Sequence, residues 1–268
     1  MQERIIMLGT GAGITQNLYN TCFLLDNGKE NLLVDTGGGI EIVKNLKKAG
    51  YELTDIHNIF ISHCHTDHIL GLIWILKILS VKWMRNQYTE NVNIYGNQEV
   101  SSVIRLLIEL MIPKGLIKII EEHITIFELS QNEDVSVAGY NINFFDLQAK
   151  GNQLHGFDII LKNGKRLVFL GDEPCKEVFL ERLHDVDYVM HEVYCMDSEE
   201  KNFGAYEFKK STIKTVCEAM KPLNIKNLIL FHTEDTHKDK TQLYSEEAKK
   251  YFDNNVIIPN DGDIIELN

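Results

Sequence analysis

The feature that most constrains this chain is one short run of residues, His63-Cys64-His65-Thr66-Asp67-His68. The run follows the apolar residues Ile59-Phe60-Ile61 and precedes a second apolar stretch. Imidazole and carboxylate are the non-thiolate ligands that Zn²⁺ and related divalent ions prefer. In a loop between a strand and a helix, the first and third positions of the run can converge on one ion, and the fifth and sixth can face a second. The run therefore predicts a metal site rather than a solvated polar loop.

Two further polar residues follow apolar, strand-like runs in the same way. Asp172 comes after Val168-Phe169-Leu170, and His232 comes after Ile229-Leu230-Phe231. Folds that mix strands and helices gather their ligands at strand ends and in the loops that leave them. We therefore expect Asp172 and His232 to share one site with the run at 63–68.

The apolar pattern predicts an α/β protein in which strands and helices alternate along the chain. Strands are expected at residues 5–8, 21–26, 31–35, 58–61, 124–129, 135–137, 142–146, 158–161, 166–170, 187–190, 227–231, 256–258 and 264–267. Helices are expected at residues 40–48, 69–79, 99–112, 211–220 and 245–252. Because no linker-like tract of Pro, Gly and Ser interrupts the sequence, we predict a single domain over residues 1–268.

Charge and cysteine usage limit the partners and the compartment. The chain has 27 basic and 39 acidic residues, a net charge of −12. This balance disfavours a nucleic acid as partner, because phosphate contacts need a basic face. Its five cysteines lack CxxC spacing, which is typical of reduced thiols in the cytoplasm. We find no signal peptide, and the apolar stretch at 69–81 is too short to cross a membrane. The sequence thus predicts a cytoplasmic protein without a membrane partner.

The spacing His63-x-His65-x-Asp67-His68 resembles the signature of the metallo-β-lactamase superfamily. Further segments of the chain resemble that superfamily in the same order: Leu8-Gly9-Thr10-Gly11, Asn20-Thr21-Cys22-Phe23, Leu33-Val34-Asp35-Thr36-Gly37, Leu170-Gly171-Asp172, His191-Glu192 and Phe231-His232-Thr233. The segment His191-Glu192 is similar to one in ribonuclease Z-type members. The resemblance implies a four-layer αβ/βα sandwich with a dinuclear metal site in the groove between its sheets.

The resemblance also implies a role for each ligand. His63 and His65 would hold a first ion together with one residue from the middle of the chain. Asp67, His68 and His232 would hold a second ion, and Asp172 would bridge the two. Two divalent ions, with Zn²⁺ favoured, lower the pKa of a shared water so that hydroxide is available near neutral pH. Asp67 is expected to orient that hydroxide and to pass its proton on.

The third ligand of the first ion departs from the family pattern. In ribonuclease Z-like members a histidine follows a strand shortly before a Gly-aromatic pair, and Gly156-Phe157 resembles that pair. The histidine position then falls on Gln148, whose amide oxygen is a poorer Zn²⁺ ligand than imidazole. We favour Gln148 lining the site over His155 binding the ion. A weakened first site, or an enzyme with a single ion, is the alternative.

A second departure concerns Lys210, which begins the run Lys210-Ser211-Thr212. Ribonuclease Z-like enzymes usually have a histidine in this place, and that histidine helps to protonate the leaving group or contacts phosphate. Lys210 is therefore a candidate catalytic residue that could neutralise a phosphate or carboxylate. An ammonium group is a poor proton shuttle near neutral pH unless its pKa is lowered. The alternative is an exposed lysine at the start of a helix.

Two other segments are placed near the site without a ligand role. Asp35-Thr36-Gly37 resembles an aspartic protease triplet, but a single copy is more simply a strand end beside the metal groove. His191-Glu192 ends an expected strand, and we expect it to hold a ligand by a hydrogen bond rather than to bind metal.

A third departure from the ribonuclease Z pattern is the lack of an RNA-binding arm. In ribonuclease Z, a long arm that grips transfer RNA is inserted between the middle ligand and the bridging aspartate. Only residues 149–171 are available here, and two expected strands fill them. Together with the acidic balance, this disfavours tRNA 3′ processing.

These observations predict a metallo-hydrolase that cleaves a phosphodiester in a small or nucleotide-like substrate. Hydrolysis of an ester, lactone or thioester is one alternative, and a metal-binding protein that has lost catalysis is another. Transfer RNA 3′ processing, with the RNA grip supplied by a partner subunit, is the third. The apolar helices expected between residues 70 and 120 could cover the site or face a second subunit, which leaves a homodimer open.

Overall fold

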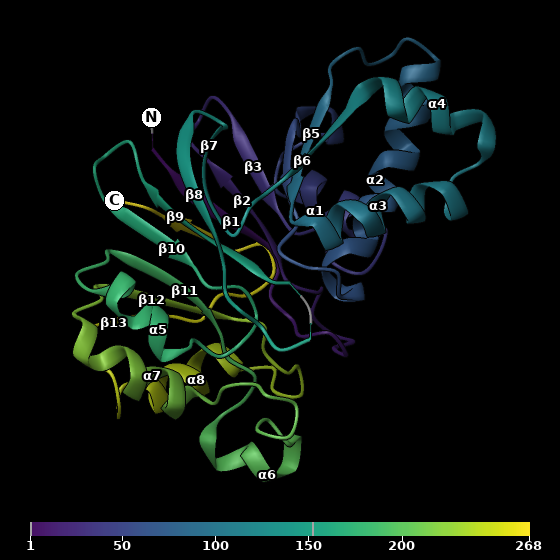
Figure 1. Cartoon of the computed structure of the whole chain (residues 1–268). Helices are drawn as coiled ribbons and strands as arrows, with labels where there is room; N and C mark the ends of the chain where they lie inside the picture. The colour runs from purple at the N-terminus through teal and green to yellow at the C-terminus, as the bar shows by residue number, and fades with distance from the viewer. Residues whose placement is uncertain (1, 152) are drawn as a thin grey trace.

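The computed structural model describes residues 2–151 and 153–268, and their strands form two seven-stranded sheets that face each other (Figure 1). The first sheet contains β1 (Arg4–Gly9), β2 (Cys22–Asp26), β3 (Asn31–Val34), β4 (Asn58–Phe60), β5 (Val92–Gly96), β6 (Ile124–Glu128) and β14 (Ile264–Glu266). The second sheet contains β7 (Asn132–Val137), β8 (Tyr140–Asp146), β9 (His155–Ile160), β10 (Arg166–Phe169), β11 (Tyr188–Glu192), β12 (Asn227–Phe231) and β13 (Asn255–Ile257).

The two sheets are built on the same plan. The first has the order β14-β1-β2-β3-β4-β5-β6, and the second has the order β13-β12-β11-β10-β9-β8-β7. In the first sheet the pairings up to β2–β3 are antiparallel, and those from β3–β4 to β5–β6 are parallel. In the second sheet β7 to β10 pair antiparallel, and β10 to β13 pair parallel. The parallel half of each sheet therefore presents several strand ends to one edge.

Helices cover the outer face of each sheet. They are α1 (Glu41–Lys48), α2 (Thr66–Met84), α3 (Gln98–Met111) and α4 (Lys114–His123) on the first sheet, and α5 (Glu177–Leu180), α7 (Ile213–Met220) and α8 (Lys240–Ala248) on the second. A short helix, α6 (Glu200–Phe203), lies at the lower edge of Figure 1. Buried apolar residues fill three layers, one between the sheets and one under each set of helices. This confirms the four-layer α/β sandwich.

Most expected elements are present, but several differ. The strand β5 and the helices α4, α5 and α6 were not expected. The helix α2 begins at Thr66 instead of Ile69, and α8 spans Lys240–Ala248 instead of residues 245–252. The first turn of α2 thus contains Asp67 and His68, two residues of the signature run. Asp67 in this turn is favourable because a helix N-terminus attracts negative charge.

The helix α2 is held close to the loop that follows β3. Thr36 donates to the carbonyl oxygen of His68 through its backbone N–H, at 2.9 Å, and its Oγ1, at 2.8 Å. Gly71 makes this approach possible, because a Cβ atom there would lie 2.0 Å from the carbonyl oxygen of Thr36. The start of α2 and the end of β3 therefore form one rigid unit beside the site. Within the described residues, no helix is long and apolar enough to span a membrane.

Candidate metal centre

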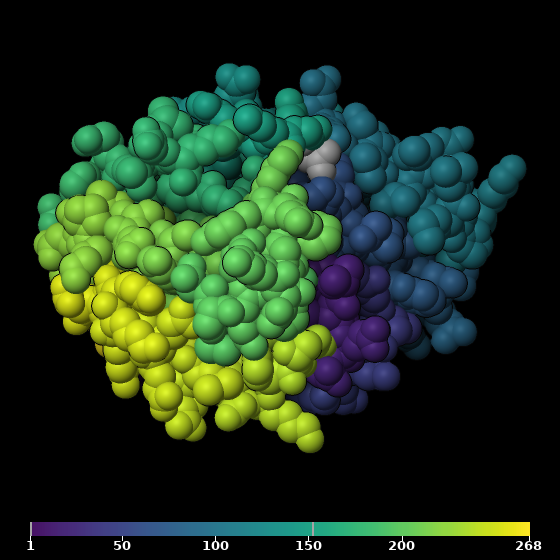
Figure 2. Space-filling model, turned by 90° about the horizontal axis from the view of Figure 1, so that it is seen from below, coloured from purple at the N-terminus to yellow at the C-terminus, as the bar shows by residue number. Residues whose placement is uncertain are grey.

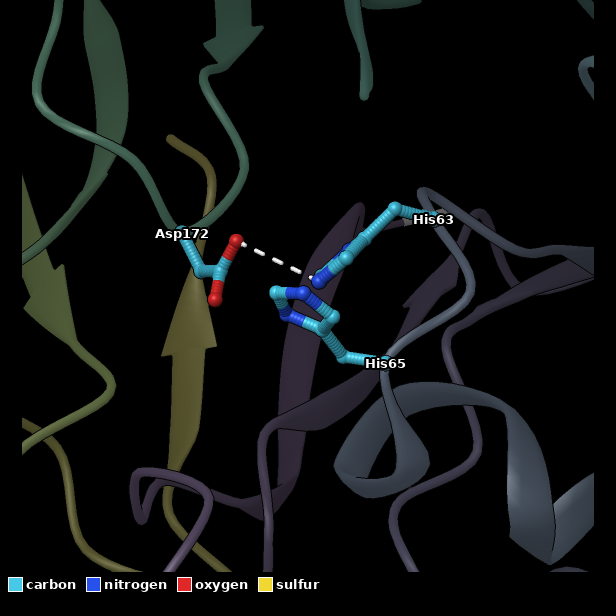
Figure 3. A group of neighbouring side chains, drawn as sticks. All are labelled: His63, His65 and Asp172. Atoms are coloured by element: carbon cyan, nitrogen blue, oxygen red, sulfur yellow. Dashed lines mark ion pairs between the residues drawn. The ribbon is translucent and has the colours of Figure 1, made fainter. Parts of the chain in front are cut away.

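The ligand residues predicted from the sequence come together from both sheets. The run at 63–68 follows β4, Asp172 follows β10 and His232 follows β12. Figure 3 shows His63, His65 and Asp172 pointing toward one another. Two groups of three possible ligands form, each with its ligand atoms within 4.8 Å of one another: His63, His65 and Asp172 in the first, and Asp67, His68 and His232 in the second.

Asp172 lies between the two groups. Its Oδ1 is 3.6 Å from Nε2 of His63, whereas its Oδ2 is 3.6 Å from Nε2 of His68 and 3.4 Å from Nε2 of His232. One carboxylate thus faces histidines of both groups with different oxygens. This arrangement is the one that a bridging ligand requires.

The donor set fits divalent metal. Nε2 of His63 and Nε2 of His68 are buried, and among the described residues neither makes a hydrogen bond, although Nε2 of His68 lies 3.2 Å from Oδ2 of Asp67. A buried nitrogen without a partner is costly, and native structures contain few of them. Nitrogen and carboxylate oxygen ligands at these positions are those that Zn²⁺ prefers. Bound metal would give both nitrogens the partner that no hydrogen bond supplies.

Asp35 orients two of the histidines. Its Oδ2 accepts from Nδ1 of His68 at 2.7 Å and from Oγ of Ser62 at 2.8 Å. The same Ser62 hydroxyl lies 3.0 Å from Nδ1 of His63 and accepts its proton while donating to Asp35. Both rings therefore carry a proton on Nδ1 and present Nε2 to the site. The sequence predicted Asp35 only as a strand end beside the groove, and nothing in its spacing revealed this role.

Burial and charge act in opposite directions on the site carboxylates. Burial raises the pKa of Asp67, but His68 and His232 outweigh it and hold that pKa far below its usual range. Burial also raises the pKa of Asp172, and His63, Lys210 and His68 lower it by more. Both carboxylates are therefore ionised near neutral pH and give the site the negative charge that attracts a cation.

The same carboxylates act on the histidines. Burial lowers the pKa of His63 and outweighs the opposing effect of Asp172. Burial also lowers the pKa of His68, yet Asp67 and Asp35 more than compensate and leave it raised. The negative charge of Asp67 and Asp35 that raises this pKa would also favour a bound metal cation.

Lys210 lies inside the site. Its Nζ is 2.8 Å from Oδ2 of Asp172, and it also donates to the carbonyl oxygen of that residue. Burial lowers the pKa of Lys210, but Asp172 and Glu192 outweigh burial and leave the pKa raised. Lys210 is therefore a fixed positive charge near neutral pH and not a proton shuttle.

Gln148 and His155, the two candidates for the third ligand of the first ion, differ in exposure and in hydrogen bonding. Gln148 is exposed, and its backbone N–H donates to Oδ1 of Asp146 at 2.7 Å. His155 is buried, with Nε2 2.9 Å from the carbonyl oxygen of Ser130 and Nδ1 3.4 Å from Nδ2 of Asn97. The described surroundings of His155 thus occupy both ring nitrogens. The preference for Gln148 over His155 stays a prediction.

His191 and Glu192 lie inside β11 rather than after it. His191 accepts the backbone N–H of Cys175 through Nε2 at 3.1 Å, and this contact holds the loop that carries Asp172. Glu192 accepts the backbone N–H of Ser211 at 2.8 Å, next to Lys210. Burial raises the pKa of Glu192 to about 8. Both residues thus contact the backbone beside site residues.

A cavity of about 360 Å³ opens at the site. It is lined by Ala12, Gly13, Ile14, His65, Asp67, Asp172, Tyr194, Phe208, Lys210 and His232. These residues come from the loop after β1, from the strand ends and from the segment around α6. Figure 2 shows that the first of these regions, in purple, and the segment near residue 200, in light green, lie side by side on this face. Among the described residues that line the cavity, none belongs to α3 or α4.

A third group of possible ligands contains Glu199, Glu234 and His237. His237 Nε2 lies 2.9 Å from Oε1 of Glu199, and Glu234 accepts from the hydroxyl of Tyr244 at 2.9 Å and from Thr236. These contacts account for the group without metal. Glu199 is distant from His237 along the chain, so the sequence spacing does not reveal this group.

Known proteins resemble the chain over nearly its whole length. A ribonuclease Z of Archaeoglobus fulgidus is 25% identical over 306 aligned residues, which cover 96% of this chain and 95% of the relative. A metallo-β-lactamase fold protein, YhfI of Bacillus subtilis, superimposes with a TM-score of 0.80 at 17% identity over 99% of this chain and 100% of the other. The short form of human tRNase Z superimposes with a TM-score of 0.73 at 21% identity over 99% of both chains.

These similarities confirm the fold and the ribonuclease Z-like character that the signature run predicted. A family model described as "Anti-Pycsar protein Apyc1" matches residues 3–242, which is most of the chain. The chain therefore belongs to the Apyc1 anti-Pycsar protein family and is a metallo-hydrolase of the metallo-β-lactamase fold.

Proposed function

We propose that the chain hydrolyses a phosphodiester in a small or nucleotide-like substrate at a site for two divalent ions, with Zn²⁺ favoured. The observation that carries this proposal is the position of Asp172 between two ligand groups, with the cation of Lys210 on the same carboxylate. Two ions about 4 Å apart suit the in-line displacement of a phosphoester. The relatives named ribonuclease Z support the reaction class, because RNA is a phosphodiester.

Each site residue has its own role in the proposed hydrolysis. When bound, the ions supply a water of lowered pKa and positive charge for the developing oxyanion. Asp67 remains ionised, so it can accept a hydrogen bond from the attacking water and orient it. Lys210, which remains protonated, adds a fixed positive charge beside the phosphate. Because Lys210 does not release its proton and Asp67 stays ionised near neutral pH, we assign the leaving group's proton to solvent.

The size and charge of the site favour a small substrate. The cavity of about 360 Å³ is at the lower end of the range for small-molecule sites. The strands β9 and β10 occupy residues 155–160 and 166–169, the part of the chain in which the ribonuclease Z arm would be inserted. With a net charge of −12, these features favour a small-molecule substrate over RNA.

The domain organisation and the cellular compartment are proposed on separate grounds. We place residues 1–268 in one domain, because the layer between the sheets draws on both halves of the chain. We place the protein in the cytoplasm, because all five cysteines are free thiols.

The test is turnover of bis(p-nitrophenyl) phosphate by the Zn²⁺-loaded protein. We expect turnover in the wild type and a loss of at least about 100-fold in Asp67→Ala, because general base groups contribute about that much. Asp134→Ala, which changes an exposed aspartate on β7, is the matched control and should retain full activity.

Other results of this test would change the proposed function. Turnover of carboxylic esters or thioesters alone would replace the phosphodiesterase by the ester hydrolase. Full metal occupancy without turnover of either class would identify a binding protein that has lost catalysis. Metal content also tests Gln148: about two ions in both wild type and Gln148→His are expected, and one ion that rises to two in the variant would show an impaired first site.

A further inference from the structure

A second cavity adjoins the metal centre at Lys210. Its volume is about 330 Å³, and most of its lining comes from the loop that carries Asp172, the segment at 206–211 after α6, and the helix α7. Among the described lining residues, Lys210 is the one that this cavity shares with the cavity of the metal centre. The side chain of Lys210 therefore forms part of the wall between the two cavities.

The wall formed by α7 is apolar. Val216, Ala219 and Met220 are spaced by three and four residues, so they share one face of the helix, and all three line the cavity. Val216 and Met220 are buried, whereas Ala219 is exposed. Pro174 and Cys175 add apolar surface from the loop after β10. Burial of carbon atoms against such a wall is favourable, because it removes them from water.

The lysine and carboxylate content of the lining is one-sided. Lys209 and Lys210 line the cavity, and no aspartate or glutamate does so within the described residues. This basic lining contrasts with the net charge of −12 of the chain. Lys210 is bound to Asp172, whereas Lys209 is exposed and forms no ion pair in the part of the chain that the structure describes. Lys209 thus offers an ammonium group to an anion in this cavity.

The backbone on both sides of the cavity is held by hydrogen bonds. The N–H of Lys209 donates to the carbonyl oxygen of Tyr206 at 3.2 Å, and that of Lys210 donates to Ala205 at 2.8 Å. Lys209 has a φ of 56°, in the left-handed region that a residue with a side chain rarely adopts. On the facing side, the contact of Cys175 with His191 holds the loop after β10. The cavity is therefore formed before any ligand binds, as is usual for small-molecule sites.

We propose that this cavity binds a small carboxylic acid with an apolar body, whose carboxylate pairs with Lys209 and whose body packs on α7. The inference goes beyond the proposed phosphodiesterase, because no described metal ligand lines the cavity. A bound acid would lie next to Lys210, the cation that holds Asp172. Such an acid would thus bind beside the metal centre without entering the substrate cavity.

The first test compares three probes in the Zn²⁺-loaded protein by titration calorimetry. Hexanoate has a carboxylate and an apolar body, acetate lacks the apolar body, and hexanamide lacks the charge. We expect hexanoate to bind with a Kd of about 1 mM, which is ordinary for so small a ligand. Acetate should bind at least about tenfold more weakly, because little carbon is buried. Hexanamide should bind about threefold more weakly, because it forms no ion pair with Lys209.

Two variants locate the site, and each has a matched control. Ala219→Phe places a ring in the cavity from an exposed position and should weaken hexanoate binding at least about tenfold, and Lys209→Met should weaken it about threefold. The controls are Glu218→Phe, at the neighbouring exposed position of α7, and Lys201→Met, at an exposed lysine of α6. Neither control residue lines the cavity, so both variants should bind hexanoate like the wild type.

Cys175 reports directly whether the cavity is occupied. Its alkylation by N-ethylmaleimide is followed by mass spectrometry, with Cys64 as the internal control. Both thiols are half-buried, burial raises the pKa of each to about 12, and Cys64 does not line this cavity. Hexanoate at about ten times its Kd should slow the alkylation of Cys175 about tenfold, because most of the protein then has a bound ligand. The alkylation rate of Cys64 should not change.

Hexanoate that binds the metal ions instead would leave Cys175 unprotected and would still bind Ala219→Phe, and this result overturns the proposal. Failure of hexanoate to bind, or equal affinities for hexanoate and acetate, also overturns it. Turnover of bis(p-nitrophenyl) phosphate is measured in the same preparations without hexanoate. Loss of that turnover rejects the phosphodiesterase alone, whereas loss of Cys175 protection rejects the carboxylate site alone.

Discussion

Asp35 illustrates how a single residue outside the signature run controls the metal centre. It binds His68 directly and reaches His63 through Ser62, so one carboxylate fixes the orientation of a ligand in each group. Hydrogen-bonded partners of this kind set the protonation state and direction of a histidine ligand. Asp35 is fully buried, so no solvent competes for these hydrogen bonds.

We predict that Asp35→Asn weakens metal binding by about 10- to 100-fold, the usual effect of losing such a partner. The amide can still accept a hydrogen bond, but it removes the charge that favours the orientation of both rings. Competition with a fluorescent Zn²⁺ chelator measures the affinity.

Asp26→Asn provides the control for Asp35→Asn. Asp26 is also a buried aspartate at a strand end, but it accepts from Arg4 and Tyr51, away from the site. The control should lose stability without a change in metal affinity. Equal metal affinity in the wild type and Asp35→Asn would show that the histidines are oriented by packing alone.

Sequence predicted best the residues whose type is restricted by metal binding. His63, His65, Asp67, His68, Asp172 and His232 were expected in one site, and the structure brings them into two adjoining groups. Asp35 was missed because its role depends on contacts across about thirty residues of sequence. Ile14 and Phe208, which line the cavity of the metal centre, were missed because apolar residues in loops carry no signal for a site.

Among the secondary structure elements, α2 is the one whose placement decides the geometry of the run. It begins inside the run and packs against the loop after β3 through Gly71. A helix that shifted along this contact would move Asp67 and His68 together.

We predict that Gly71→Ala destabilises the protein by about 1–3 kcal/mol, the usual cost of overpacking, because its Cβ atom would collide with the carbonyl oxygen of Thr36. Chemical denaturation measures this change. Gly115→Ala on α4 is the matched control, since no described atom lies within 4 Å of the added Cβ. The control should gain up to about 1 kcal/mol from helix propensity. Equal stability of Gly71→Ala and the wild type would show that α2 can move away freely.

The first residue of α8, Lys240, connects the two sheets by hydrogen bonds. The buried Nζ of Lys240 donates to Oγ1 of Thr10 and to Oγ1 of Thr233, each at 3.0 Å. Burial lowers the pKa of Lys240 to about 8, although Asp261, Glu234, Asp263 and Asp235 oppose that effect. In the unfolded chain the pKa returns to 10.5, so between about pH 8 and 10.5 the unfolded state binds more protons.

Below about pH 8, Lys240 is charged in the folded and the unfolded state, so folding bears the full free-energy cost of burying the charge. As the pH rises, the buried amine loses its proton and this cost decreases. We predict that the wild type gains up to roughly 2 kcal/mol between pH 7.5 and 9.5 relative to Lys240→Met, which carries no charge to bury. Denaturant unfolding at the two pH values measures the difference. Lys249→Met, at an exposed position after α8, should behave like the wild type, and a parallel response of all three proteins would contradict the assignment.

Elements with strong apolar runs were predictable, whereas short or charge-rich ones were not. Strands such as β12 were expected at their observed bounds because their residues are almost wholly apolar. The strand β5 was missed because its five residues include two polar or small positions. The helix α4 was missed because Gly115 and its charged residues dilute the periodic apolar pattern. The early start of α2 was missed because its first turn consists of polar ligand residues.

At the scale of the whole molecule, the metal centre joins the two halves of the sandwich. One sheet contributes the signature run, and the other contributes Asp172 and His232. Ions bound between them would oppose separation of the sheets, since ligands that bind only the folded state stabilise it. The resemblance predicted the layers, but not the contribution of the segment after α6 and the loop after β1 to the lining of the cavity.

We predict that removal of metal by a chelator lowers the melting temperature by roughly 10 °C, which corresponds to about 3–4 kcal/mol for a chain of this size. Scanning calorimetry of Zn²⁺-loaded and chelator-treated protein measures the change. Asp67→Ala should show a smaller difference, because its second ligand group is incomplete. An identical melting temperature with and without metal would mean that the sheets dock independently of the ions.

The separation of the ligands along the chain has a consequence for synthesis. The signature run is synthesised well before Asp172 and His232. A product cut short before residue 232 would display the histidine-rich run and still be unable to hold both ions. A second ion held by Asp67, His68 and His232 would therefore bind only after synthesis has passed residue 232, so metal loading would distinguish such chains from shorter products.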